Sequence, residues 1–201
     1  MKGAGRLVAV FAMLAGLLLL PGSAAAQGAT VERPFAPGGQ VRMDLSAADY
    51  TIEAGRDDRI LVRWEVHSPE DAARVKVDIQ RQGSAATITT KGPHNNFRVL
   101  IELPARTDLR VELSAGELKI RGIEGSKDVG SWAGDIDIDV GRASDYATAE
   151  ASVRAGDLTA PAFNVSKSGL FRSFSWKGPG RYTLRVKLTA GDLRLREAQA
   201  R

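Results

Sequence analysis

The sequence predicts an all-β protein, a single-domain degenerate β-solenoid or β-helix-like stack with N-terminal strand hairpins and at most one short helical turn. Apolar and polar residues alternate along almost every segment after residue 40, which is the period of strands with one buried face. Turn-forming residues separate these segments. A phrase of Ala, then Gly or Ala, then an acid, then apolar-x-apolar also recurs, in residues 45–52, 113–120, 131–138, 153–160 and 188–195. Recurrence of this kind is typical of stacked repeat architectures.

Residues 1–26 have the pattern of a cleaved Sec signal peptide. Lys2 and Arg6 precede an apolar run over residues 7–20, and small residues follow up to Ala26. The run is shorter than the roughly 20 apolar residues that a membrane-spanning helix needs. We therefore expect export to the periplasm or the cell exterior, cleavage near Ala26, and a mature chain without a membrane span.

The mature chain is expected to begin with an irregular lead-in over residues 27–39, where Pro34, Pro37 and two adjacent glycines stand. The strand-repeat domain then covers residues 40–197. Residues 68–74 are the one helical candidate, because a serine cap, a proline at the first position and early acids suit a single short turn.

Each repeat contains a change of parity. Leu109, Val111 and Leu113 share one parity, whereas Leu118 and Ile120 take the other. A flat strand would expose its second half after such a step. We therefore predict a bulge or corner at the Ala-Gly-acid step, where glycine supplies backbone freedom and the acid accepts hydrogen bonds from unpaired N–H groups. The predicted corner residues are Asp49, Gly116, Glu117, Gly134, Asp135, Gly156, Asp157, Gly191 and Asp192.

The segments 97–104, 109–125 and 134–138 together resemble the bacterial putative-adhesin family with β-strand repeats, also described as toastrack-like β-solenoid domains. The resemblance extends over residues 41–195. It implies an exported or envelope-associated repeat domain, and it supplies no catalytic residues to carry over. The chain departs from the pattern at Ala48, where the usual glycine is absent, and in the long step from Gly156 to Gly191.

Composition excludes several classes of function. The chain has no cysteine, so disulfides, thiolate metal sites and a lipid-modified N-terminal cysteine are ruled out. The formal net charge is +4, and loss of Lys2 and Arg6 with the signal peptide leaves +2. We therefore expect no nucleic-acid binding by the chain as a whole, and no cofactor.

Positive charge nevertheless gathers near the C-terminus, where residues 166–201 hold nine basic side chains against Asp192 and Glu197. Arg185, Lys187, Arg194 and Arg196 alternate with apolar residues, which predicts an outward basic face. Such a face suits an anionic cell-surface polymer or an acidic envelope protein. The alternative is a charged surface that discourages aggregation between strands.

Asp135, Asp137 and Asp139 alternate with apolar residues and predict three carboxylates on one strand face. A Ca²⁺ site is one interpretation, and a solvated outer face is the favoured one, because a flat row of acids does not surround an ion. Paired carboxylates also raise the alternative of a carbohydrate-active β-helix enzyme. The sequence contains no other catalytic or metal-binding pattern.

These observations favour a non-catalytic, exported envelope scaffold or binding module. Its expected partner is an anionic envelope polymer or an unidentified envelope protein. The first alternative is an accessory protein of envelope stress or signalling, and the second is the carbohydrate-active enzyme.

Overall fold

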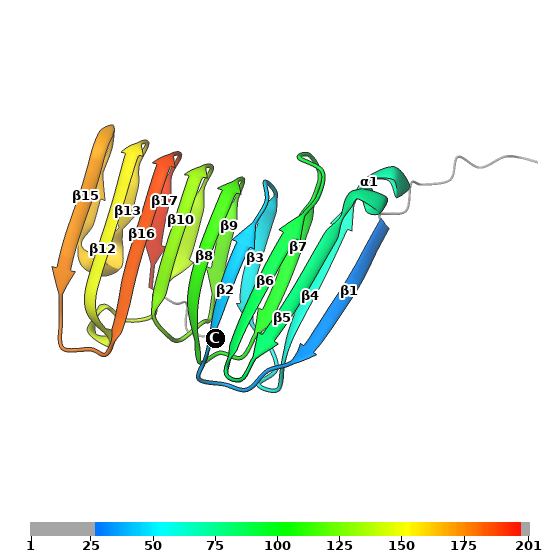
Figure 1. Cartoon of the computed structure of the whole chain (residues 1–201). Coiled ribbons are helices and arrows are strands. Elements are labelled where there is room, and N and C mark those ends of the chain that lie inside the picture. The colour runs from blue at the N-terminus through cyan, green and yellow to red at the C-terminus, as the bar shows by residue number, and fades with distance from the viewer. Residues whose placement is uncertain (1–26, 198–201) are drawn as a thin grey trace, which may run out of the picture.

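The computed structural model describes residues 27–197, which form two large β-sheets packed face to face (Figure 1). The nine-stranded sheet contains, in spatial order, β1 (Gln27–Pro34), β4 (Arg59–Val66), β7 (Arg98–Leu103), β3 (Asp49–Ala54), β9 (Leu118–Arg121), β11 (Ile136–Asp139), β17 (Leu193–Arg196), β13 (Leu158–Ala160) and β14 (Val165–Lys167). The eight-stranded sheet contains β15 (Leu170–Lys177), β12 (Tyr146–Ala155), β16 (Tyr182–Ala190), β10 (Lys127–Ala133), β8 (Thr107–Ala115), β2 (Gly39–Leu45), β6 (Ala85–Lys91) and β5 (Lys76–Gln82). The predicted all-β class is confirmed.

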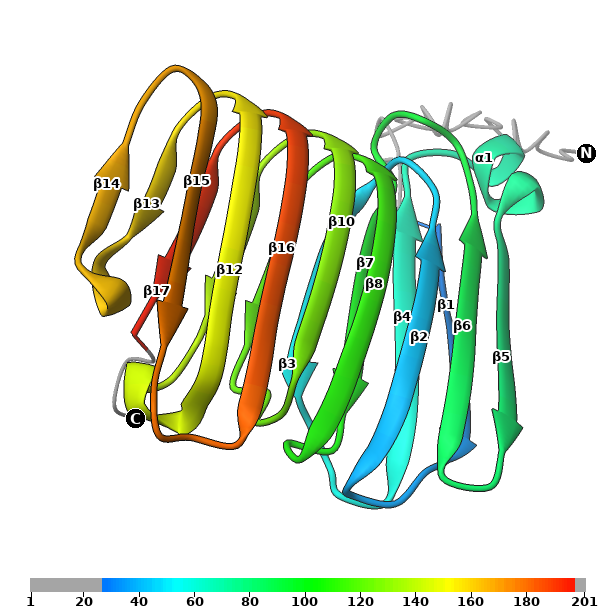
Figure 2. The same ribbon diagram turned by 60° about the vertical axis from the view of Figure 1, so that its left-hand side comes forward.

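Six strand pairs form the body of the molecule. We call each pair a coil, because one strand of the eight-stranded sheet is followed directly by one strand of the nine-stranded sheet (Figure 2). Neighbouring coils pair in parallel, in the spatial order β6–β7, β2–β3, β8–β9, β10–β11, β16–β17 and β12–β13. This order differs from that of a simple solenoid, in which successive coils are neighbours. Here β2–β3 and β16–β17 each lie between two coils that are closer to one another in sequence.

Antiparallel strands cover both ends of the stack. Strands β1, β4 and β5 lie at one end, and β14 and β15 at the other. The prediction of an irregular lead-in over residues 27–39 is wrong for Gln27–Pro34, which is strand β1 and pairs with β4 throughout its length. An edge strand of this kind buries little, so it lacks the alternation by which buried strands are predicted, and Pro34 is tolerated at its end.

The helical content is small, as predicted. Helix α1 (Pro69–Arg74) begins after Ser68, whose hydroxyl accepts the backbone N–H of Asp71 at 3.1 Å. Two 3₁₀ helices, η1 (Ala143–Asp145) and η2 (Pro161–Phe163), were not predicted. Segments of three residues carry no periodic signal. No helix in the described residues has the length and apolar character needed to cross a membrane.

The core fills the space between the sheets. The inward side chains of each coil lie in rows across the stack, as in the row Met43, Val111, Val129, Val186 and Ala151. Near the β14–β15 end the core becomes aromatic, where Phe163 packs against Phe174, Trp176 and Tyr146.

Candidate functional site

The recurring Ala-Gly-acid steps, with Ala-Ala-acid in the first copy, lie at the turns where five of the six coils pass from one sheet to the other, whereas β6–β7 turns through residues 92–97. Their glycines form one column in the order Gly116, Gly134, Gly191 and Gly156, each with a φ between +109° and +133°. A Cβ on Gly134 would lie 2.0 Å from the carbonyl oxygen of Gly116. The coils therefore approach too closely for a side chain, and the backbone conformation also favours glycine. Ala48 stands at one end of this column, and its N–H donates to the carbonyl of Ala115.

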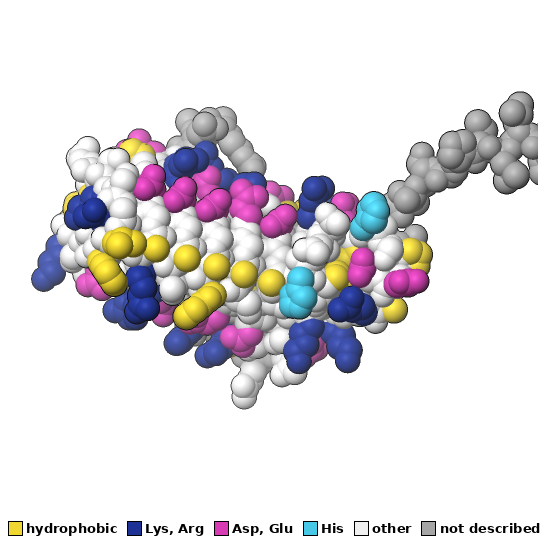
Figure 3. All heavy atoms as spheres, turned by 90° about the horizontal axis from the view of Figure 1, so that it is seen from above, with side chains coloured by type: hydrophobic (Ala, Val, Ile, Leu, Met, Phe, Trp, Pro, Cys, Tyr) yellow, Lys and Arg dark blue, Asp and Glu magenta, His cyan; other side chains and the backbone are white. Residues whose placement is uncertain are grey.

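The acids of the same steps form a second column, which is visible as a row of acidic side chains in Figure 3. Three of them accept a backbone N–H from the neighbouring coil. Asp49 accepts from Glu117 at 3.4 Å, Asp135 from Asp192 at 3.1 Å, and Asp192 from Asp157 at 2.9 Å. These carboxylates act as local backbone acceptors at the corners.

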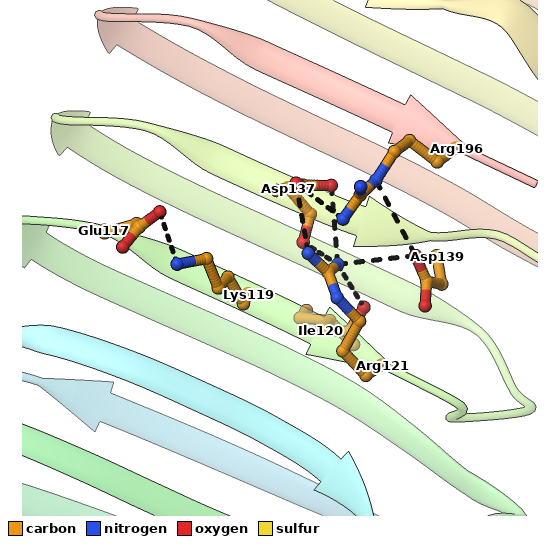
Figure 4. A network of polar contacts seen from close by, with 7 residues as sticks. All are labelled: Glu117, Lys119, Ile120, Arg121, Asp137, Asp139 and Arg196. Atoms are coloured by element: carbon orange, nitrogen blue, oxygen red, sulfur yellow. Dashed lines mark hydrogen bonds and ion pairs between the residues drawn. The ribbon is translucent and has the colours of Figure 1, made fainter. Parts of the chain in front are cut away.

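Strand β11 carries two acids that are engaged by arginines from both neighbouring strands (Figure 4). Asp137 lies 3.0 Å from Arg121 on β9 and 2.8 Å from Arg196 on β17. Asp139 lies 3.4 Å from Arg121 and 3.9 Å from Arg196. The two carboxylates are neutralised by protein side chains, and no group of metal-ligating side chains is found among residues 27–197.

The four basic residues of the predicted basic face do not lie on one face. Arg185 and Lys187 belong to β16 of the eight-stranded sheet, whereas Arg194 and Arg196 belong to β17 of the nine-stranded sheet. The prediction of a single face is wrong because the corner at Gly191 lies between the pairs. Both strands bury their apolar side, so their polar sides point in opposite directions.

Strand β10 differs from its neighbours at three positions. In the register of β10 against β8, three residues are of a different type: Lys127 is level with Leu109, Gly130 with Glu112 and Trp132 with Ser114. Lys127 faces the core, whereas Gly130 and Trp132 lie on the outer face. An alignment of the repeats on their corner glycines contains this signal, because it sets Lys127 against Leu109 and Trp132 against Ser114.

Both outer positions line a groove of about 480 Å³ on the eight-stranded sheet. The side chain of Glu112 on β8 lies over Gly130, and Trp132 is 70% exposed at one end of the groove. The groove is lined principally by Arg110, Asp128, Gly130, Trp132, Arg185 and Lys187.

The cations of this groove are weakly paired. Arg185 approaches Glu150 only to 3.8 Å, and both side chains are more than half exposed. Arg110 and Lys187 form no ion pair with the described residues. The groove therefore holds three cations and the two carboxylates of Glu112 and Asp128, with an exposed indole ring at one end.

A larger cavity of about 680 Å³ lies beside the N-terminal end of β10. It is bordered by three loops distant in sequence, around residues 122–125, 139–146 and 179–182. Its apolar lining includes Ile123, Val140 and Pro179, and its aromatic lining consists of Tyr146 and Tyr182. Arg181 stacks over the Tyr182 ring at 4.7 Å.

Lys127 is only 2% exposed and does not line this cavity, but both of its hydrogen-bond partners do. Its Nζ donates to the carbonyl of Gly125 at 3.1 Å and to the hydroxyl of Tyr146 at 3.2 Å. Burial lowers the pKa of Lys127 to about 8, against the opposing effect of the charges on Asp108, Glu124 and Asp139. Burial likewise raises the pKa of Tyr146, and the neighbouring Asp145 raises it further.

No protein-family model matches the sequence, and no curated protein matches it either. Solved structures do. A putative cell adhesion protein from Clostridium sporogenes superposes with a TM-score of 0.56 at 14% identity, over 85% of this chain and 100% of that chain. The chain shares the fold of that protein.

Two further structures resemble parts of the chain more weakly. A putative adhesin from Parabacteroides merdae matches at 14% identity and a TM-score of 0.30, over 56% of this chain and 58% of that chain. A putative lipid binding protein from Parabacteroides distasonis matches at 11% identity and a TM-score of 0.25, over 84% and 62%. The expected resemblance to putative adhesins is thus confirmed at the level of the fold.

Proposed function

We propose that the protein is an exported, non-catalytic binding module of the cell envelope, and that its contact surface is the groove on the eight-stranded sheet. One observation carries the proposal. The groove holds Arg110 on β8 and Arg185 and Lys187 on β16, the two strands that flank β10, and the exposed Trp132 lies at one end of it. The fold shared with a putative cell adhesion protein supports the same class of function.

The partner that best suits this groove is an anionic envelope polymer. Adjacent strands lie about 4.8 Å apart, so cations on β8 and β16 stand roughly 10 Å apart across β10. An extended polyanion that crosses the strands would contact the cations of β8 and then those of β16. The indole face of Trp132 offers a flat apolar surface to sugar rings, and Glu112 and Asp128 offer acceptors to hydroxyl groups.

The carboxylates on which the enzyme alternative depended have other partners. Asp135 accepts a backbone N–H from Asp192, and Asp137 contacts two arginines. A glycosidase needs one carboxyl group able to give a proton and another free to act as base or nucleophile. Their present contacts do not favour that chemistry, so the binding function is preferred.

The proposal is tested by sedimenting the purified mature chain with cell-wall and outer-membrane material at low and high salt. Lys187→Glu should abolish salt-sensitive binding, because it reverses a charge inside the groove. Arg194→Glu is the matched control. It makes the same change of charge at an exposed residue of the other sheet and should bind like the wild type.

Trp132→Ala should weaken binding at both salt concentrations, because the indole contact is not electrostatic. Equal losses of binding in Lys187→Glu and Arg194→Glu would indicate a general charge effect. That result would overturn the proposal that the groove is the contact surface. A different outcome is that the chain sediments with envelope material only before protease treatment of that material, and not with purified polymer. That result would favour the accessory-protein alternative.

A further inference from the structure

Strand β15 is the edge of the eight-stranded sheet at one end of the stack (Figure 2). It pairs with β12 along its length, and no strand within residues 27–197 pairs with its other side. An open strand edge presents unpaired N–H and C=O groups, which readily pair with another strand. This open edge is eight residues long.

The other sheet edges carry features that discourage such pairing. Strand β1 ends in Pro34, β5 alternates Lys76 with Asp78 and further polar residues, and β14 has only three residues. Strand β15 contains neither an acid nor a proline, and its aromatic residues are Phe171, Phe174 and Trp176. It is therefore the least protected sheet edge in the described structure.

Several groups of β15 lack a partner within the described chain. Leu170 is 63% and Phe171 76% exposed, and Phe171 has a φ of +55°, which is unusual for a bulky residue. Phe174 and Trp176 pack against the core but are only half-buried. The buried Nε of Arg172 has no hydrogen-bond partner among residues 27–197. A further strand at this edge would cover these groups.

The direction of the backbone groups along β15 follows from its pairing with β12. The N–H of Gly156 donates to the carbonyl of Gly169, just before β15. Because this direction alternates along a strand, the even-numbered residues of β12 are directed at β15, and their partners Ser173 and Ser175 are directed back at β12. The residues of β15 that direct their N–H and C=O groups at the open edge are therefore Arg172, Phe174 and Trp176.

We propose that β15 pairs antiparallel with β15 of a second copy of the chain, about a two-fold axis at Phe174. In this register the strand is complementary to itself. Each cation of one copy lies opposite an aromatic ring of the other, and no charge lies opposite a like charge. The opposed residues are Arg172 and Trp176, Phe171 and Lys177, Ser173 and Ser175, and Phe174 with itself.

Lys167 opposes this pairing. Its Nζ donates to the carbonyl of Ser173 at 2.6 Å, and Ser173 is adjacent to the axis. The Lys167 side chains of the two copies would therefore lie near one another. Salt screens their repulsion, so association should be tighter at high salt.

The two-fold axis is perpendicular to the sheet, so the outer faces of both copies point the same way. The two eight-stranded sheets join into one, and both copies present the β10 groove on the same side. The pairing does not depend on what the groove binds. If the groove binds a repeating polymer, two grooves on one side would strengthen that binding through multivalency.

Sedimentation equilibrium of the purified mature chain, at several protein concentrations and at low and high salt, measures the association. The wild type should form a reversible dimer. Ser173→Glu combined with Ser175→Glu should raise the dissociation constant at least tenfold, because it sets carboxylates opposite one another across the axis. Ser152→Glu is the matched control, since it adds a carboxylate at an exposed position of the inner strand β12 and should dimerise like the wild type.

A mixing experiment separates repulsion from a failure to fold. Ser173→Lys combined with Ser175→Lys should also be monomeric by itself. An equimolar mixture of the double glutamate and double lysine variants should form mixed dimers, which unfolded variants would not do.

Single cysteines test the register, because the chain has no cysteine of its own. Under mild oxidation, Ser173→Cys mixed with Ser175→Cys should form a disulfide-linked pair, since opposite residues of neighbouring strands are close enough for this bond. Preferential linkage of either variant to itself would contradict the axis at Phe174.

A wild type that stays monomeric at every concentration and salt level would overturn the proposal. An unchanged dissociation constant in the double glutamate variant would overturn it too. Neither result bears on the groove, whose binding is measured with Lys187→Glu and Trp132→Ala, so the two proposals fail separately.

Discussion

Lys127 places an amine where the neighbouring coils place leucine, alanine or valine. Its nearest partners are a carbonyl and a hydroxyl, neither of which neutralises a charge. Tyr146 lies close enough for a contact between the ammonium and its ring, with 5.7 Å to the centroid. These contacts reduce the unfavourable free energy of burying Lys127 without removing it.

Replacement of Lys127 by methionine should therefore stabilise the protein. We expect the free energy of unfolding to rise by about 1–3 kcal/mol at pH 7, because an apolar side chain of similar length fits the row. Urea denaturation of the mature chain measures the change. Lys187→Met is the control, since an exposed position should change little. A loss of stability in Lys127→Met would show that the ammonium contacts outweigh the cost of burial.

The stability of the wild type should also depend on pH through Lys127. Its pKa is about 8 in the folded chain and 10.5 ordinarily. Below pH 8 both states hold the proton, so the cost of the buried charge is fully present. Between pH 8 and 10.5 the unfolded chain binds more protons, so the free energy of unfolding rises with pH.

The Lys127→Met variant lacks this contribution, so the difference in stability between variant and wild type should narrow from pH 7 to pH 9.5. The carboxylates that act on Lys127 are those of Asp108, Glu124 and Asp139. Urea titrations at both pH values provide the measurement. A constant difference would contradict the lowered pKa.

At the scale of the element, the corner glycines set how closely the coils can stack. Gly134→Ala should be severely destabilising, because its Cβ would overlap the Gly116 carbonyl and its φ is +109°. We expect a loss of roughly 3 kcal/mol or more from steric overlap and backbone strain together.

Gly83→Ala is the matched control for the corner. Gly83 also has a positive φ, of +60°, but a Cβ there meets nothing within 4 Å. Backbone strain alone should cost about 1 kcal/mol. Equal losses in the two variants, measured by thermal or urea unfolding, would show that close stacking at the corner is unimportant.

At the scale of the whole molecule, the last coil of the chain lies inside the stack. Strand β16 pairs with both β10 and β12, and β17 pairs with β11 and β13. The β12–β13 coil precedes β16–β17 in the sequence, but it does not pair directly with β10–β11. The stack is therefore complete only when the C-terminal segment has entered it.

Removal of residues 182–201 should consequently abolish cooperative unfolding, because it deletes the coil between two others. Removal of β1, which pairs on one side only, should leave a single transition at lower stability. Far-UV circular dichroism during urea titration distinguishes these results. Cooperative unfolding of the C-terminal truncation would mean that β10–β11 and β12–β13 can pair directly.

Part of the candidate site could have been predicted from the repeats. Aligned on Gly116 and Gly134, Lys127 falls opposite Leu109 and Trp132 opposite Ser114, and each mismatch marks an unusual position. The cavity itself could not be predicted in this way. Its walls come from loops near residues 124, 142 and 180, and only the packed stack brings them together.

The sequence by itself determined the all-β class, the inward side of the alternating strands and the place of the Ala-Gly-acid corners, because these depend on local periodicity and on glycine. Only the tertiary structure decided the order of the coils. Their inner faces are similarly apolar, so no coil specifies its neighbour through a pattern visible in the chain. The same limit applies to Arg185 and Arg194, which share a local pattern and lie on opposite faces because a corner separates them.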